Sequence, residues 1–188
     1  HRLDKETSGI LLLARNVKTA GAFATLFRAK QVEKVYWALV EGVPKKEKGI
    51  LESYIGVVDI WKPSINLGLI EQKKSRQYNA NKKKALTFYK VMEKIGSKYA
   101  WLELKPATGR THQLRIHCAK LGNPIVGDRK YKSSEDKNSQ DLPYSFKKLF
   151  LHARCVTFVH PTSKKTTKIE APLPKHMGLV WKHFGWKI

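Results

Sequence analysis

The chain has 188 residues, enough for one domain with a buried core, and 41% of them are hydrophobic. No apolar stretch approaches the roughly 20 residues that cross a bilayer, and two cysteines are too few for a disulfide framework, which favours a reducing compartment. The 37 Lys and Arg outnumber the 15 Asp and Glu and give a formal net charge of +22. Such a charge attracts polyanions, and nucleic acid is the usual partner of a basic domain, although a solubilising lysine-rich surface would have the same composition.

The first part of the chain contains three predicted elements. Residues 9–15 form an unbroken apolar run, GILLLAR, which is typical of a strand buried on both faces. Residues 17–30 follow the capping residue Asn16 and carry alanine and phenylalanine at helical spacing, which predicts an amphipathic helix. Residues 32–42 alternate with a period of two and predict a strand.

The middle of the chain begins with a polar stretch from 44 to 84, in which only 50–58 carries a weak strand signal. Its last part, 73–84, holds six basic residues and no acidic one. We interpret 44–84 as a loop-rich insertion rather than as a second domain. Residues 87–95 and 98–106 then predict a hairpin that turns at Gly-Ser.

The last part begins with a helix after Thr108-Gly109, which we expect to bury Leu114, Cys118 and Leu121 and to end at Gly122. Residues 132–148 are polar and turn-rich, and we interpret them as a second loop-rich insertion. Two further strands, 149–159 and 164–172, are expected to pair before a short closing helix. The chain 1–188 is therefore predicted to be a single α+β domain with a mixed, mostly antiparallel sheet and flanking helices.

Two candidate functional residues are Asp4, which precedes the first predicted strand, and Tyr36, which stands on the second. Asp4 comes just before the turn Thr7-Ser8-Gly9 and the apolar run, so its carboxylate can face a cleft at the rim of the sheet. Its alternative role is structural, because an Asp at this place can accept hydrogen bonds from the amides of the turn. Tyr36 shares a strand face with Lys34, and its alternative is an ordinary half-buried strand tyrosine.

A third candidate region is the segment 105–131. On the predicted helix Thr111, His112 and Arg115 share one face beside the apolar stripe, so Arg115 can project from a supported position into a site. Arg110 and Arg115 near a helix start also suit contact with phosphate. An ordinary solvated face would explain poorly why two arginines and two histidines fall within eight residues.

Several chemistries are not supported by the spacing of the residues. His112 and His117 are five apart, about 140° round a helix, and so cannot both face one metal ion. The cysteines lack the paired spacing of a zinc site, and neither Gly-rich nucleotide motif is present. No pair of carboxylates for two-metal phosphodiester cleavage is evident. We therefore predict neither a metal site nor a nucleotide cofactor.

Three long motifs, in this order, resemble the RluA-type family of pseudouridine synthases. HRLDKETSG is similar to the family segment H-R-L-D-x-x-T-S-G, and KVYWALVEG to its K-x-Y-x-A-x-V-x-G strand. TGRTHQLRIHCAKLGNPIVGDRKY resembles the segment T-G-R-x-H-Q-L-R-x-H followed by G-x-P-I-x-G-D-x-x-Y. Within the family, the RluC-like enzymes of the ribosomal large subunit are the most similar subgroup.

The resemblance implies that uridine in RNA is isomerised without any cofactor: the C1′–N1 bond breaks, the uracil turns, and a C1′–C5 bond forms. Asp4 matches the catalytic aspartate, which acts either by covalent attack on the ribose C1′ or by abstraction of the 2′ proton. Arg115 matches the second arginine of its motif and is expected to pair with Asp4 and hold it ionised. Tyr36 matches the active-site tyrosine, which stacks on the uracil and assists proton removal from C5.

The same resemblance implies binding of RNA with the target base flipped out of its stack. Arg2 corresponds to the arginine that fills the space left by the base, with His1 beside it. The other predicted RNA contacts are Thr7, Lys34, Arg110 and His112. We expect ribosomal RNA as the partner, a monomer, no membrane, and the bacterial cytoplasm as the compartment, although an organellar homologue would look similar.

Alternatives remain open at this stage. A tRNA-directed synthase and a non-catalytic RNA-binding or ribosome-assembly module could share the fold. A sugar- or nucleotide-processing hydrolase would need a second carboxylate near Asp4. Family members normally carry a core strand with a Lys-Pro-x-Gly turn before H-R-L-D, and often a small S4-type RNA-binding domain. We therefore expect that the N-terminal part of the domain is missing from this sequence and that the sheet lacks one strand.

Overall fold

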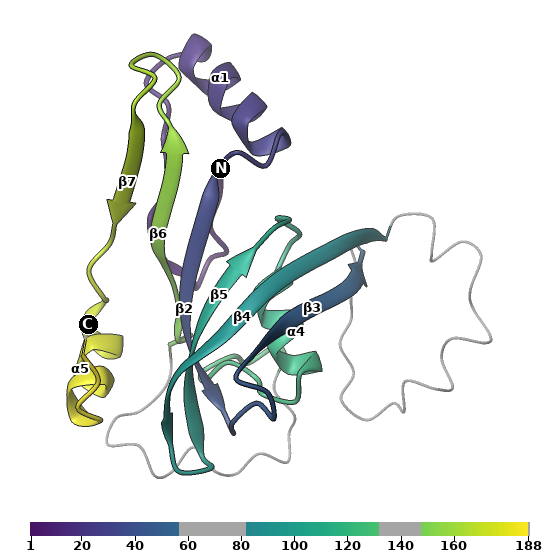
Figure 1. The fold of residues 1–188 in the computed structure, drawn as a ribbon, viewed down its shortest axis with the longest axis vertical. Helices are drawn as coiled ribbons and strands as arrows, with labels where there is room; N and C mark the ends of the chain where they lie inside the picture. Colours follow the sequence, from purple (N-terminus) through teal and green to yellow (C-terminus); the bar gives the residue numbers. More distant parts are fainter. Residues whose placement is uncertain (57–81, 132–147, 188) are drawn as a thin grey trace.

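A computed structural model describes residues 1–56, 82–131 and 148–187 of the chain. Within these ranges seven strands form one sheet in the order β1-β6-β2-β5-β4-β3, with β7 paired to β6 (Figure 1). The strands are β1 (Ser8–Gly9), β2 (Glu33–Glu41), β3 (Lys48–Ile55), β4 (Lys83–Ile95), β5 (Tyr99–Pro106), β6 (Leu151–Val159) and β7 (Thr166–Glu170). The helices are α1 (Val17–Arg28), α4 (Gln113–Lys120) and α5 (Lys175–His183).

The sheet is mixed because β1 runs parallel to β6 whereas the other neighbouring strands are antiparallel. The predicted α+β class, with a mostly antiparallel sheet and flanking helices, is confirmed. The predicted hairpins β4-β5 and β6-β7 are also present, and the first of them turns at Gly96, whose φ of 52° suits glycine. None of the helices in the described ranges is long and apolar enough to cross a membrane.

The main core lies around the central strands β2 and β5. Trp101 of β5 contacts Trp37 of β2 and Trp181 of α5, with ring centroids 4.6 and 5.4 Å apart. Leu114 and Cys118 bring α4 into the same cluster. A smaller cluster fixes α1 at the other end of the sheet, where Phe23 packs edge-on against Phe158 of β6. The helices α1 and α4 are therefore both held against the sheet by apolar side chains of its strands.

The prediction for residues 9–15 is wrong. Only Ser8–Gly9 is a strand, and Leu11 and Leu13 have exposed fractions of 47% and 81%. The strand lies at the edge of the sheet with β6 as its partner in the described residues, so the apolar run is not covered on both faces. Gly9 adopts a φ of 110°, which ends the extended conformation.

The two predicted insertions are only partly described. Segment 44–84 is not wholly a loop, because its weak strand signal corresponds to β3, which pairs with β4 along its full length. Residues 57–81 of that segment and 132–147 of the second insertion lie outside the described residues. The helix prediction after residue 108 also needs a correction, since α4 begins at Gln113 and its expected buried residue Leu121 is only half-buried.

The buried His117 on α4 makes the free energy of unfolding depend on pH. His117 shares hydrogen bonds of 2.9 Å with the hydroxyls of Thr87 and Ser53. Burial, with a smaller effect from Lys120, lowers the pKa of His117 to about 4 from 6.5. The unfolded chain therefore binds the proton more readily, so this residue's contribution is complete above pH 6.5 and is lost as the pH falls towards 4.

We expect the free energy of unfolding to fall by up to about 3 kcal/mol over that range, as measured by urea titration at a series of pH values. The variant His117→Gln is the control, because other titrating groups act equally in both proteins. The difference between the two plots of unfolding free energy against pH should give the contribution of His117. Parallel plots would contradict the prediction.

Candidate active site

A cleft lies between the first residues of the chain, α1, β2 and the connection from β5 to α4. Its volume is about 670 Å³, which is in the range of sites that enclose a small ligand. Asp4 and Tyr36 both line it, and Asp4 is the only carboxylate among the described residues that do. This set gives no support to a hydrolase with two carboxylates. The other predicted site residues that line the cleft are His1, Arg2, Thr7, Lys34 and Arg110.

Asp4 is held in place by the turn that follows it. The amide of Thr7 donates to the backbone carbonyl of Asp4 at 2.9 Å, and β1 then pairs with β6. Gly9 is required there, because a Cβ would overlap the carbonyl oxygen of Ala153. Within the described ranges no hydrogen bond to the Asp4 carboxylate is found, so the turn amides do not occupy it. The side chain is 22% exposed and open to the cleft.

Tyr36 stands on β2, whose alternation places it on the face opposite Trp37. Burial raises the pKa of the Tyr36 phenol to about 12, and the negative charge of Asp4 contributes to this shift. The phenol is therefore neutral at physiological pH. A neutral phenol can stack on a base and form hydrogen bonds, but it does not act as a phenolate base.

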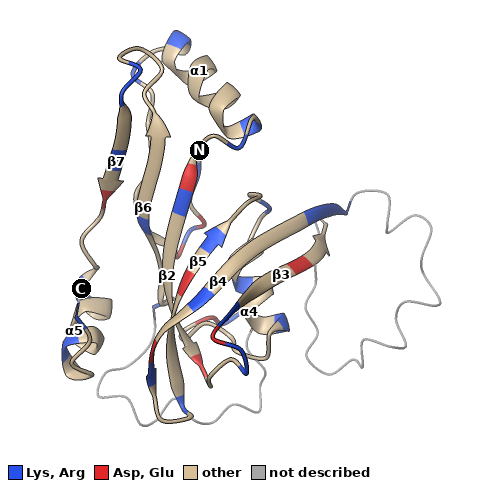
Figure 2. Cartoon of the chain, in the orientation of Figure 1, with Lys and Arg blue, Asp and Glu red and all other residues tan. Residues whose placement is uncertain are grey.

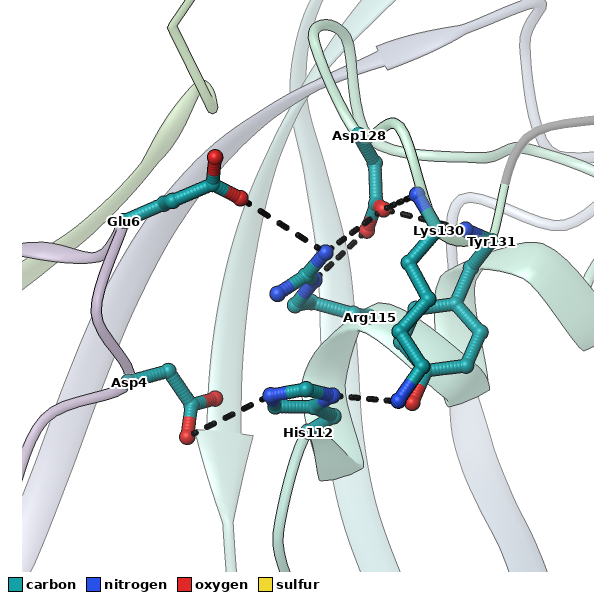
Figure 3. Close-up of polar contacts among 7 residues, drawn as sticks. All are labelled: Asp4, Glu6, His112, Arg115, Asp128, Lys130 and Tyr131. Atoms are coloured by element: carbon teal, nitrogen blue, oxygen red, sulfur yellow. Dashed lines mark hydrogen bonds and ion pairs between the residues drawn. The ribbon is translucent and has the colours of Figure 1, made fainter. Parts of the chain in front are cut away.

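Arg115 has a different partner from the expected one. Its Nε and Nη2 donate to the two oxygens of Asp128 at 2.7 and 2.8 Å, and Glu6 lies 3.8 Å from Nη2 (Figure 3). The Arg115 side chain is only 5% exposed and does not line the cleft. The expected pair with Asp4 is thus replaced by a buried bidentate pair, because the turn after Gly127 brings Asp128 directly against the guanidinium.

Among the described residues, His112 is the basic side chain within ion-pair distance of the Asp4 carboxylate. Its Nε2 lies 4.0 Å from Asp4, and its Nδ1 shares a hydrogen bond of 2.8 Å with the hydroxyl of Tyr131 (Figure 3). Burial lowers the pKa of His112, partly offset by the charge of Asp4, which favours the neutral form of the ring. His112 has a φ of 54° just before α4, so it does not lie on a helix face as predicted.

The other predicted contacts differ in how free their side chains are. His1 accepts from the amide of Leu12 at 3.0 Å and stacks on Phe27, with centroids 5.2 Å apart, so its ring is already engaged. Arg110 donates from Nε to a backbone carbonyl, which leaves the rest of its guanidinium available. Burial lowers the pKa of Lys34. The hydroxyl of Thr7 is buried with no hydrogen-bond partner among the described residues.

Sequence reasoning missed a buried glutamine that shapes the rim of the cleft. Oε1 of Gln113 accepts from the hydroxyl of Thr108 at 2.7 Å and from the amide of Arg110 at 3.0 Å, while Nε2 donates to Leu86 and Thr87 of β4. It ties the turn before α4 to the sheet. Asp128, the partner of Arg115, was missed as well. A signal for both existed, because Gln113 and Asp128 stand at defined positions of the family segments T-G-R-x-H-Q-L-R-x-H and G-x-P-I-x-G-D-x-x-Y.

In the part of the chain that the structure describes, no group of three or more His, Cys, Asp or Glu is placed to hold a metal ion. The cleft instead presents one carboxylate, one neutral phenol and several basic side chains. Such a set can transfer a proton or attack carbon while it holds a phosphate backbone.

Comparison with known proteins agrees with this chemistry. A sequence model for a family described as RNA pseudouridylate synthase matches residues 1–120. An uncharacterised RNA pseudouridine synthase of Zymomonas mobilis is 39% identical over 176 residues, which cover 93% of this chain and 72% of the relative. A ribosomal large subunit pseudouridine synthase C of Rickettsia typhi is 38% identical over 180 residues, 93% of this chain and 52% of the relative. The chain thus spans about half the length of the Rickettsia protein.

Solved structures give the same class. The human RNA pseudouridylate synthase domain containing 4 has a TM-score of 0.77 at 28% identity, covering 100% of this chain and 76% of that one. The human domain containing 1 has a TM-score of 0.69 at 30% identity, with 93% and 68% covered. The fold is that of the pseudouridylate synthase domains, a class of RNA-modifying isomerases. The chain belongs to the RNA pseudouridylate synthase family, which confirms the resemblance seen in the three motifs.

The neutral phenol leads to a prediction for Tyr36→Phe. This variant keeps the ring but loses the hydroxyl, and we expect kcat to fall by about 10²-fold with little change in KM, because the hydrogen bond of the neutral hydroxyl in the transition state is lost while stacking remains. The pH–rate profiles of the wild type and of Tyr36→Phe should have the same shape between about pH 6 and pH 9, since the phenol does not ionise in that range. A step that disappears in the variant would mean that a phenolate takes part.

Proposed function

We propose that this chain isomerises specific uridines of large-subunit ribosomal RNA, acting as a monomer in the bacterial cytoplasm. The observation that carries the proposal is the Asp4 carboxylate, which no hydrogen bond within the described ranges occupies and which lines the same cleft as Tyr36. The names of the Rickettsia relatives favour large-subunit RNA as the substrate. The net charge of +22 supplies attraction for its phosphates.

In the proposed reaction the target uridine is flipped into the cleft. Asp4 then attacks C1′ or removes the 2′ proton, and the bond from C1′ to N1 breaks. The uracil turns and C1′ bonds to C5, while the bond from Asp4 to C1′ breaks or, on the second route, the 2′ proton is returned. The proton on C5 then leaves, and N1 gains a proton. The atoms of the nucleotide are conserved, so no oxidant or cofactor is consumed.

The surrounding residues are given supporting roles. Tyr36 stacks on the uracil as a neutral phenol, which fits its high pKa. Lys34 and Arg110 bind phosphates at the mouth of the cleft, and Arg2 fills the space that the flipped base leaves in the RNA. Arg115 acts as a positioning residue, because it connects the buried Asp128 to Glu6 in the turn that carries Asp4.

The test is a map of pseudouridines in the RNA of a strain that lacks the gene. We expect one or a few sites in large-subunit ribosomal RNA to remain uridine and to be restored by the wild-type gene. Asp4→Asn should not restore them. Loss of sites in tRNA alone would replace the proposed substrate with tRNA, and unchanged maps for all RNA would support a non-catalytic module.

A further inference from the structure

A second groove opens beside the cleft, and its lining is not explained by the isomerisation itself. Its volume is about 730 Å³, and it lies between the end of α1, the start of β2 and the segment that leaves β5. The two cavities share lining residues and therefore form one continuous depression. The shared residues are Phe27, Lys34, Pro106, Thr108, Gly109 and Arg110.

The lining of this groove is strongly basic. It contains five basic side chains and one carboxylate, that of Glu33. Lys105 lies 3.8 Å from Glu33 and 3.4 Å from Glu103, so its charge is balanced locally. The other basic side chains are Arg28, Lys30, Lys34 and Arg110. Figure 2 shows Lys and Arg on the end of α1, on the connection to β2 and on the end of β5 that borders it.

Two of these cations have neutral partners that leave their charge uncompensated. Nη2 of Arg28 donates to the hydroxyl of Thr25 at 3.2 Å, and Nε of Arg110 donates to the carbonyl of Lys84 at 3.2 Å. Both walls of the groove therefore offer guanidinium groups with free donors, one from the α1 side and one from the β5 side. A strand of phosphates is the ligand that such a pair of walls fits.

Lys30 adds a cation at a position where glycine is the usual residue. It follows the last turn of α1 with a φ of 57°, and the amides of Lys30 and Gln31 donate back to Phe27 and Leu26. A lysine in this conformation costs stability relative to glycine. The same groove contains Phe88, a strand residue with an exposed fraction of 43%, on which a base can stack.

We infer that this groove binds the single-stranded RNA that continues from the nucleotide in the catalytic cleft, with phosphates along Arg28, Lys30 and Arg110 and a base on Phe88. The inference rests on the proposed function for its choice of polyanion. Single-stranded RNA is favoured over a duplex because an aromatic ring in a groove can stack only on an unpaired base.

The first test removes two charges from one wall. In the double variant Arg28→Gln/Lys30→Gln, neither residue belongs to the catalytic set. We expect the slope of log K against log salt for a short labelled single-stranded RNA to become less negative by about 1.4, or about 0.7 for each charge. We also expect KM to rise about tenfold at low salt while kcat at saturating RNA stays unchanged.

Lys164→Gln/Lys165→Gln is the matched control. These lysines are exposed and line neither cavity, and Lys164 has the same φ of 57° as Lys30. An equal change of slope in both double variants would overturn the inference, because the effect would then belong to the overall charge. Tighter binding of duplex than of single-stranded RNA would overturn it too. If the wild type binds single-stranded RNA with the expected salt slope but isomerises no uridine, the proposed function is wrong while the inference about the groove is still supported.

The second test concerns the stacked base. Phe88→Leu should weaken the binding of single-stranded RNA by about fivefold without changing the salt slope, because it removes stacking and no charge. The control is Tyr54→Leu, which removes an aromatic ring that is 60% exposed on the neighbouring strand and lines neither cavity. Equal weakening by both variants would contradict a specific place for the base.

Discussion

The variant Asp4→Asn should release almost no tritium from RNA labelled at C5 of uridine, with a rate at least about 10³-fold below the wild type. Asparagine has nearly the same shape as aspartate but is neither a good nucleophile for C1′ nor a base for the 2′ proton. Because no hydrogen bond to the carboxylate is found in the described ranges, the change should not disturb the turn. Thermal unfolding should therefore give the same Tm for both proteins.

Glu6→Gln provides the control for this experiment. Glu6 belongs to the same turn and undergoes the same chemical change, but its carboxylate does not line the cleft. It faces Arg115 at 3.8 Å and is 44% exposed, so its loss should be felt weakly. We expect Glu6→Gln to keep most of the activity, because the amide oxygen of glutamine can still lie against the Arg115 guanidinium and hold the turn in place. If Asp4→Asn were as active as Glu6→Gln, the assignment of Asp4 as the catalytic residue would be wrong.

Local patterns were sufficient for most of the fold. Strands β2, β5 and β6 were predictable because each is a short run rich in aromatic, β-branched and other apolar residues, and at eight or nine residues each is of strand length. Residues 9–15 were mispredicted because the local pattern does not contain the information that decides their structure. An apolar run shows that a segment is hydrophobic, but whether both of its faces are covered depends on which strands lie beside it, and β1 is at an edge.

The candidate site shows the same division. The cleft does bring Asp4 and Tyr36 together, which the motifs led us to expect. The partner of Arg115 could not be derived, since several carboxylates stood within reach and the choice depends on a turn 12 residues further on, at Gly127 with a φ of 77°. His112 was also misplaced, because a non-glycine residue with positive φ is too rare to be expected from its sequence.

The buried pair of Arg115 and Asp128 should be the most costly of the described ion pairs to break. The two side chains are 5% and 1% exposed, and Oδ1 of Asp128 also accepts from the amides of Lys130 and Tyr131. Asp128→Asn keeps the shape but leaves the buried guanidinium with the more distant, 44% exposed carboxylate of Glu6 as its remaining counter-charge. We expect the free energy of unfolding to fall by about 3–5 kcal/mol and Tm by about 10 °C, measured by urea and thermal unfolding.

Two companion variants separate the buried charge from other causes. Glu52→Gln breaks a pair with Lys84 that is just as short, 2.8 Å, but about half exposed, and should cost less than about 1 kcal/mol. Arg115→Met/Asp128→Asn removes the stranded charge as well, so it should be more stable than Asp128→Asn alone. If instead the double variant were the least stable of the three, the cost would come from lost packing and hydrogen bonds of Arg115, and the uncompensated charge would not be its cause.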